Sequence, residues 1–125
     1  MKIKKIKNIK TSETVLSFFQ NIHQFMKIKR IFFVNSKKKC TRGKHAHKKC
    51  TQVLMSVKGD FNLEIINNKV TKNIRLKEMK NYIIVPPKHW INVYFEKNQK
   101  LMVMCDFNFS KNDYINNFKI FKNFN

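Results

Sequence analysis

Acidic residues are scarce in this chain of 125 residues: seven Asp and Glu accompany 27 Lys and Arg, so the formal net charge is +20. A charge of that size in a small protein attracts nucleic acid, anionic membranes or phosphorylated ligands. The excess is nearly all lysine, however, and it is scattered along the chain, with few arginines to form the forks that read bases and phosphates. We therefore expect a solvated basic surface and no specific nucleic-acid partner.

Cysteine is also sparse, and the three present, Cys40, Cys50 and Cys105, form no C-x-x-C pair. An odd number without that spacing argues against a disulfide framework and a zinc knuckle, so we expect reduced thiols. No apolar run reaches the ~20 residues of a membrane span. The basic segment 1–10 lacks the apolar core of a signal peptide. These absences predict a cytoplasmic protein that does not enter a membrane.

Proline is limited to the adjacent pair Pro86-Pro87, and no repeat, low-complexity linker or Pro/Ser-rich hinge interrupts the sequence. We therefore predict a single domain over residues 1–125. Short apolar segments with a period of two recur between turn signals such as Lys58-Gly59-Asp60, which predicts an all-β sandwich or barrel. The predicted strand segments are 1–10, 13–20, 23–34, 45–57, 61–66, 70–76, 82–85, 89–95 and 101–107.

The C-terminal segment has a different pattern. Ser110, followed three residues later by Asp113, resembles a helix N-cap with an acidic first turn. Apolar residues then repeat at helical spacing. We expect one C-terminal helix, packed on the barrel through Phe118 and Phe121.

The most informative stretch is Arg42-Gly43-Lys44-His45-Ala46-His47. On a strand, His45 and His47 point to the same face, and imidazole is the side chain best suited to proton transfer near neutral pH. Arg42 has the opposite parity, but Gly43 allows the chain to re-aim it. Burying an arginine beside two imidazoles costs free energy unless an anionic ligand pairs with it. The alternative is a pair of hydrogen-bonded core histidines.

With Gln52 and Gly59, the histidine pair follows the first cupin motif, G-x5-H-x-H-x(3,4)-E-x6-G, apart from its leading glycine. In metal-binding cupins, the glutamate of this motif and a histidine of a second motif, P-x-G-x2-H-x3-N, complete the ligand set. Those two positions here are Gln52 and Ile91. Two imidazoles alone hold a divalent ion weakly, so we predict no metal, with His89 as an alternative third ligand.

Several stretches together resemble one branch of the cupins, the WxcM-like dTDP-sugar 3,4-ketoisomerases. They run in register over about residues 28–121. Residues 28–33 are similar to the K-R-x-Y-Y block of the family, and residues 42–49 are similar to its R-G-x-H-A-H-K-K block. Residues 52–54 match its Q-x-L element, Gly59 matches its glycine, and residues 86–90 match its P-P-x-x-W element. Residues 113–118 are similar to its D-Y-I-x-x-Y ending.

The resemblance implies a jelly-roll cupin that works without metal or cofactor, as a homodimer whose subunits exchange N-terminal strands. It implies that dTDP-4-keto-6-deoxy-D-glucose becomes a dTDP-3-keto-6-deoxyhexose for a later aminotransferase. Moving a ketone to the adjacent carbon needs a base, an acid and a donor near the enolate oxygen. We predict that His45 and His47 move the protons and that Arg42 stabilises the enolate or orients the ligand. Which histidine serves which carbon stays open.

The predicted substrate-binding residues come from the same blocks. Arg30, with nearby lysines, suits the diphosphate, and Trp90 covers the sugar or the base. The other predicted substrate-binding residues are Phe33, Lys44 and Gln52.

The chain departs from the family at two places. Phe32-Phe33 stands where the family has a tyrosine pair, so the role of a phenolic hydroxyl passes to another group or to water, or is dispensable. Ile91 stands where the family often has histidine, which leaves the product configuration at C4 open. Two other functions are weighed: a 3,5-epimerase, disfavoured because no separate histidine–aspartate dyad is evident, and a non-catalytic cupin module that binds a sugar nucleotide or a polyanion.

Overall fold

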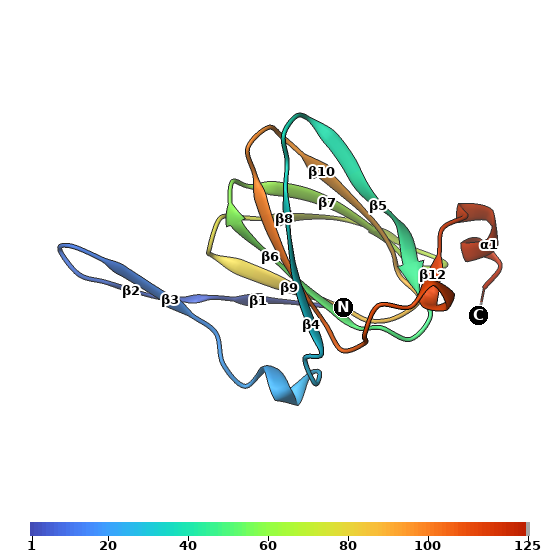
Figure 1. The fold of residues 1–125 in the computed structure, drawn as a ribbon, viewed down its shortest axis with the longest axis horizontal. Helices are drawn as coiled ribbons and strands as arrows, with labels where there is room; N and C mark the ends of the chain where they lie inside the picture. Colours follow the sequence, from blue (N-terminus) through green and yellow to red (C-terminus); the bar gives the residue numbers. More distant parts are fainter. Residues whose placement is uncertain (125) are drawn as a thin grey trace.

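The computed structural model describes residues 1–124, and its main body is a sandwich of two antiparallel sheets (Figure 1). Within these residues, one sheet has the strand order β1-β9-β6-β11-β4 and the other β12-β5-β10-β7-β8. Most strands that follow one another in the chain, such as β5 and β6, lie in different sheets, whereas β7 and β8 pair in one sheet. This is a jelly-roll arrangement, and it confirms the predicted all-β fold with a short C-terminal helix.

The bounds of the elements are β1 (Lys2–Lys5), β2 (Lys7–Lys10), β3 (Val15–Phe18), η1 (Ile22–Gln24), β4 (Arg30–Asn35), β5 (Cys40–His47), β6 (Gln52–Lys58), β7 (Phe61–Ile66), β8 (Thr71–Leu76), β9 (Asn81–Val85), β10 (Trp90–Phe95), β11 (Lys100–Cys105), η2 (Lys111–Asp113), β12 (Tyr114–Ile115) and α1 (Phe118–Lys122). None of the helices described in residues 1–124 is long and apolar enough to cross a membrane.

Three predicted strand segments are interrupted in the structure. The segment 1–10 is divided into β1 and β2, which belong to different sheets. The segment 45–57 becomes the end of β5 and nearly all of β6, because the chain turns between them where the Lys48 N–H donates to the Asp113 carbonyl. The segment 23–34 contains the end of the 3-10 turn η1, and β4 follows only after it. Tertiary contacts therefore set these boundaries more than the apolar pattern does.

The C-terminal helix is shorter than predicted. α1 begins after Asn117, whose side chain accepts a hydrogen bond from the Ile120 N–H at 3.1 Å. The predicted cap, Ser110, instead precedes the 3-10 turn η2. Residues 114–115 then form β12 against β5, so sheet pairing overrides the helical spacing of this segment. Phe121 of α1 is buried against the outer face of the second sheet, as predicted.

Apolar side chains on the facing sides of the two sheets form the main core. Phe61 and Phe95 meet there at nearly a right angle, with ring centroids 5.0 Å apart. A second cluster covers the outer face of the first sheet, where Ile6 and Met26 pack with Tyr82. The N-terminal segment therefore closes part of the first sheet from outside.

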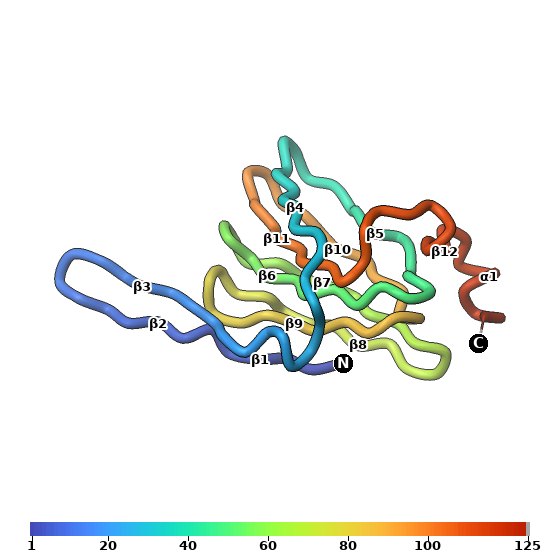
Figure 2. Tube along the Cα trace, turned by 60° about the horizontal axis from the view of Figure 1, so that its bottom comes forward, coloured from blue at the N-terminus to red at the C-terminus, as the bar shows by residue number. Residues whose placement is uncertain are grey.

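The hairpin of β2 and β3 extends away from this body as an arm (Figures 1 and 2). It carries the apolar side chains of Ile9, Val15 and Leu16, which are 53%, 57% and 59% exposed. The outer face of β4, at the edge of the first sheet, exposes Ile31 and Phe33 in the same way. Two separate apolar surfaces are thus left in contact with solvent.

Candidate active site

A cavity of about 550 Å³ lies between the two sheets. Its apolar wall consists of Phe32, Val34, Leu54, Ile91, Val93, Phe95, Leu101 and Val103. Its polar lining consists of Arg30, Thr41, Arg42, Lys44, His45, Gln52 and Tyr114. Three of these polar residues are cationic, and none of the residues that line the cavity in the described chain is acidic. The cavity therefore suits an anionic ligand that also has apolar surface.

A β-bulge in β5 brings Arg42 and His45 to the same face of the sheet. Gly43 and His45 pair with consecutive residues of β10, so Lys44 between them is the extra residue. Gly43 and Lys44 adopt left-handed backbone, with φ of 84° and 54°. A Cβ on Gly43 would lie 2.6 Å from the carbonyl oxygen of Ile91. The bulge therefore requires glycine, and it re-aims Arg42 as the sequence predicts.

His45 presents a neutral base to the cavity. Its Nδ1 lies 2.8 Å from the Gly43 carbonyl oxygen. Because a carbonyl only accepts, Nδ1 carries the proton, and Nε2 of the neutral ring keeps its lone pair. Burial lowers the pKa of His45 below its usual 6.5, and the nearby charges of His47 and Arg42 lower it further, against the hydrogen bond to Gly43. The ring is therefore largely unprotonated at neutral pH.

His47 lies behind His45 and is tied to a carboxylate. It is 3% exposed, and its Nδ1 donates to Oδ2 of Asp113 at 2.8 Å. The other carboxylate oxygen of Asp113 accepts the Lys49 N–H at 2.7 Å. The rings of His45 and His47 are nearly perpendicular, with centroids 4.9 Å apart. Burial lowers the pKa of His47 in spite of Asp113. The two histidines therefore differ in position: one lines the cavity and the other supports it.

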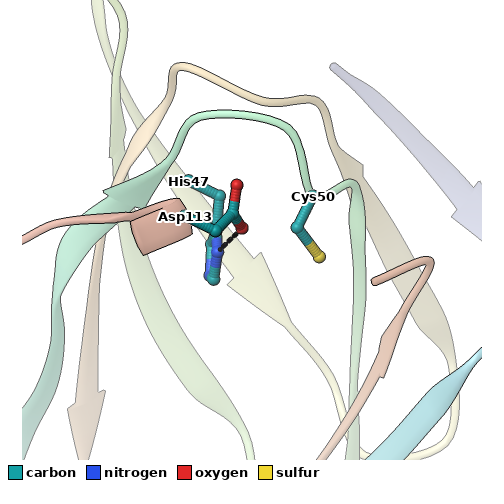
Figure 3. A group of neighbouring side chains, drawn as sticks. All are labelled: His47, Cys50 and Asp113. Atoms are coloured by element: carbon teal, nitrogen blue, oxygen red, sulfur yellow. Dashed lines mark hydrogen bonds and ion pairs between the residues drawn. The ribbon is translucent and has the colours of Figure 1, made fainter. Parts of the chain in front are cut away.

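Cys50 lies beside this buried pair (Figure 3), and one ligand atom from each of His47, Cys50 and Asp113 falls within 4.8 Å of the others. The Asp113 carboxylate, Nδ1 of His47 and the Cys50 thiol, which donates to the Thr51 carbonyl at 3.4 Å, are already hydrogen-bonded, whereas Nε2 of His47 is buried without a partner in the described chain. Because most of the possible ligand atoms are engaged in hydrogen bonds, the group fits a support better than a metal centre. His89, the alternative ligand, bonds instead to the backbone carbonyl two residues before it.

A buried thiol anchors two of the residues that line the cavity. Nη2 of Arg30 and Nε2 of Gln52 each lie 3.5 Å from Sγ of Cys105, which is fully buried. The neighbouring side chains of Cys50, Gln52 and Arg30 lower the pKa of the Cys105 thiol against the opposing effect of burial. Arg30 therefore has an anionic or strongly polar partner that holds its guanidinium at the cavity.

Two predicted substrate-binding residues lie outside the cavity. Phe33 points to the outer face of β4 and is 54% exposed, because Arg30 and Phe32 occupy the inward positions of that alternating strand. Trp90 is buried beneath α1, and its Nε1 donates to Asn92 at 3.2 Å. Each of these two residues is one position away along its strand from a side chain that lines the cavity.

Sequence reasoning missed two residues of the site, Asp113 and Tyr114. Both fall in the segment that was predicted to be helical, although the D-Y-I block of the family resemblance includes them. Tyr114 lines the cavity and Asp113 bonds to His47. The remaining predicted residues, namely His45, Arg42, Arg30, Lys44 and Gln52, all line the cavity.

Comparison with known proteins gives the same assignment. The family model described as FdtA, WxcM-like C-terminal, matches residues 1–125, so the chain belongs to this family. A curated TDP-4-oxo-6-deoxy-alpha-D-glucose-3,4-oxoisomerase from Aneurinibacillus thermoaerophilus is 28% identical over 99 residues, which are 78% of this chain and 71% of that protein. The family predicted from the sequence is therefore confirmed.

Solved structures agree with this family assignment. The sugar 3,4-ketoisomerase QdtA from Thermoanaerobacterium thermosaccharolyticum, in complex with TDP, is 25% identical with a TM-score of 0.88, over 98% of this chain and 91% of that chain. A 3,4-ketoisomerase from Helicobacter canadensis is also 25% identical, with a TM-score of 0.89 over 98% and 94% of the two chains. The rmlC epimerase of Mycobacterium tuberculosis shares the fold alone, at 11% identity and a TM-score of 0.78.

The bulge generates a test of the site geometry. We expect Gly43→Ala to lower the free energy of unfolding by about 1–3 kcal/mol, because a side chain is strained in left-handed backbone and here also meets the backbone of β10. It should also weaken binding of dTDP, since Arg42 and His45 lose their common face. Thermal unfolding and calorimetric titration with dTDP measure the two effects.

Gly59→Ala is the matched control. Gly59 has a similar φ of 86°, but a Cβ there would meet the side chain of Gln99, away from the cavity. This variant should lose stability and keep its affinity for dTDP. Equal losses of affinity in the two variants would show that the bulge does not shape the site.

Proposed function

We propose that this protein isomerises dTDP-4-keto-6-deoxy-D-glucose to a dTDP-3-keto-6-deoxyhexose, moving the ketone from C4 to C3. The observation that carries the proposal is the position of His45: a neutral imidazole with a free Nε2 in a cavity that also holds two arginines. The family membership and the 3,4-ketoisomerase names of its relatives support the same reaction.

The reaction needs a base that removes a proton from a carbon of the sugar, and His45 is the group placed for this role. Its Nε2 takes the proton from C3, and the electron pair left behind forms the C3=C4 bond of an enediol. The same nitrogen then returns a proton to C4. Arg42 shares the cavity face with His45 and stabilises the negative charge of the enolate. Arg30, anchored on Cys105, adds a second cation for the anionic nucleotide.

The His47–Asp113 pair is a support and not a second base. His47, a member of the predicted strand pair, forms a dyad with Asp113, but both residues are buried, at 3% and 7% exposure, and neither lines the cavity. An epimerase acting at two carbons would need such a group at the substrate. Among the described residues that line the cavity, His45 is the one histidine, which favours a proton transfer between neighbouring carbons.

The second proposal concerns the partner subunit. We infer that two copies pair by packing the β2–β3 arm of each on the other, as the exchange of N-terminal strands expected from the resemblance requires. The arm exposes Ile9, Val15 and Leu16, and the outer face of β4 exposes Ile31 and Phe33. Exposed apolar surfaces of this kind mark interaction sites in soluble proteins.

We predict that His45→Asn lowers kcat about 100-fold or more, the usual contribution of a general base. Binding of dTDP should change only a few-fold. His47→Asn should lower kcat less and lower the melting temperature, because Asp113 loses a buried partner. Conversion of dTDP-4-keto-6-deoxyglucose in heavy water measures the rate together with deuterium uptake at C3 or C4. Wild-type deuterium uptake by His45→Asn would contradict the assignment.

The pH profile gives an independent test. The base must be unprotonated, so kcat/KM should fall as the pH falls through the pKa of His45. Since burial and the nearby cations lower that pKa, the midpoint of the acid limb should lie below 6.5. A midpoint above 6.5 would mean that the free enzyme uses another base.

The arm is tested by Leu16→Asp, which places a charge in the proposed interface. We expect this variant to run as a monomer in size-exclusion chromatography with light scattering, where the wild type runs as a dimer. Ile120→Asp is the matched control, since Ile120 of α1 is 60% exposed at the opposite end of the molecule. A monomeric wild type, or a dimeric Leu16→Asp variant, would overturn the proposed pairing.

A further inference from the structure

The proposed reaction, on which this inference rests, moves two kinds of proton. One passes from C3 to C4, and His45 accounts for it. The other belongs to the oxygens: O4 is a ketone at the start and a hydroxyl at the end, while O3 changes in the opposite sense. A group in the cavity must therefore give a proton to O4 and take one from O3.

The polar residues of the cavity differ in their ability to do this. Arg30 and Arg42 keep their protons at any physiological pH, and the amide of Gln52 neither gains nor loses one. The hydroxyl of Thr41 is far less acidic than a phenol, and Lys44 is exposed to solvent. Of the residues that line the cavity in residues 1–124, Tyr114 is the one phenol.

Tyr114 is held at the histidines by its place in the fold. β12 pairs with β5 so that Tyr114 lies opposite His47, and the tyrosine ring centroid is 4.4 Å from that of His47 and 5.0 Å from that of His45. Its neighbour Asp113 is fixed by two hydrogen bonds to the β5 end and the turn after it. The phenol is therefore positioned beside the base without being buried completely.

Arg30 lines the same cavity as Tyr114, so a guanidinium and a phenol face the substrate together. A phenylalanine would pack against the two imidazoles equally well, so packing alone does not account for the hydroxyl in this position.

We propose that Tyr114 is the acid–base residue for the substrate oxygens. As Nε2 of His45 removes the C3 proton, the C3–H electron pair forms the C3=C4 bond, the C4=O π pair moves to O4, and the phenol protonates O4. The phenolate then takes the proton of the C3 hydroxyl, the C3=O bond forms, and the C3=C4 pair takes a proton from His45 at C4. The phenol is regenerated, and no oxidant or reductant is needed.

The first test is Tyr114→Phe, with Tyr94→Phe as the matched control because Tyr94 is exposed on the outer face of β10. We expect kcat for conversion of dTDP-4-keto-6-deoxyglucose to fall about 100-fold or more in Tyr114→Phe. Binding of dTDP should stay within a few-fold, and Tyr94→Phe should match the wild type. A Tyr114→Phe enzyme with wild-type kcat overturns the inference, whereas a wild type that does not convert the sugar overturns the proposed function instead.

The second test separates proton transfer from positioning and keeps the shape of the side chain. In the double variant Tyr82→Phe/Tyr94→Phe, Tyr114 is the single tyrosine of the chain. Biosynthetic replacement by a ring-fluorinated tyrosine then lowers the pKa of this phenol alone. The basic limb of the kcat profile should move to lower pH with it. A basic limb that stays in place while conversion continues would assign Tyr114 a packing role and overturn the inference.

Discussion

The carboxylate of Asp113 is the interaction on which the site depends. Through its two oxygens it binds the ring of His47 and the backbone of Lys49, and its own carbonyl accepts the Lys48 N–H. These bonds fasten the C-terminal segment to the end of β5. Charge-assisted bonds of this kind are strong when buried, and removing one partner from such a pair typically costs about 3–5 kcal/mol. The position of Tyr114 in the cavity follows from this attachment.

The electrostatics of the cavity serve two needs at once. A base that must accept a proton from carbon has to be neutral, and the cations around His45 favour its neutral form. The same cations attract a nucleotide diphosphate. A single arrangement of positive charge therefore prepares the base and holds the substrate, and the apolar wall of Phe32, Ile91 and Val93 limits the water that would screen it.

Much of the site could be predicted from the sequence. The histidines of the R-G-x-H-A-H stretch predict proton transfer, and its glycine predicts that the chain can re-aim Arg42. The family could be predicted from sequence motifs spread along the chain, and the all-β fold from the alternating apolar segments between turns. Phe33 and Trp90 lie outside the cavity because strand pairing decides which face a residue takes, and a shift of one residue changes the face. Asp113 and Tyr114 were missed because the helical spacing of the C-terminal segment gives no sign that its first residues pair with β5.

The bulge in β5 has a consequence for chain length. Arg42 and His45 are three positions apart, an odd number, yet they share a face because Lys44 adds a residue that has no partner of its own in β10. Lys44 is thus an inserted residue whose effect on the facing of the strand is absorbed by the bulge. Flattening the strand without losing that residue would turn either the guanidinium or the imidazoles out of the barrel, whereas a chain shortened by Lys44 would keep both inside. At this position the number of residues matters more than their identity.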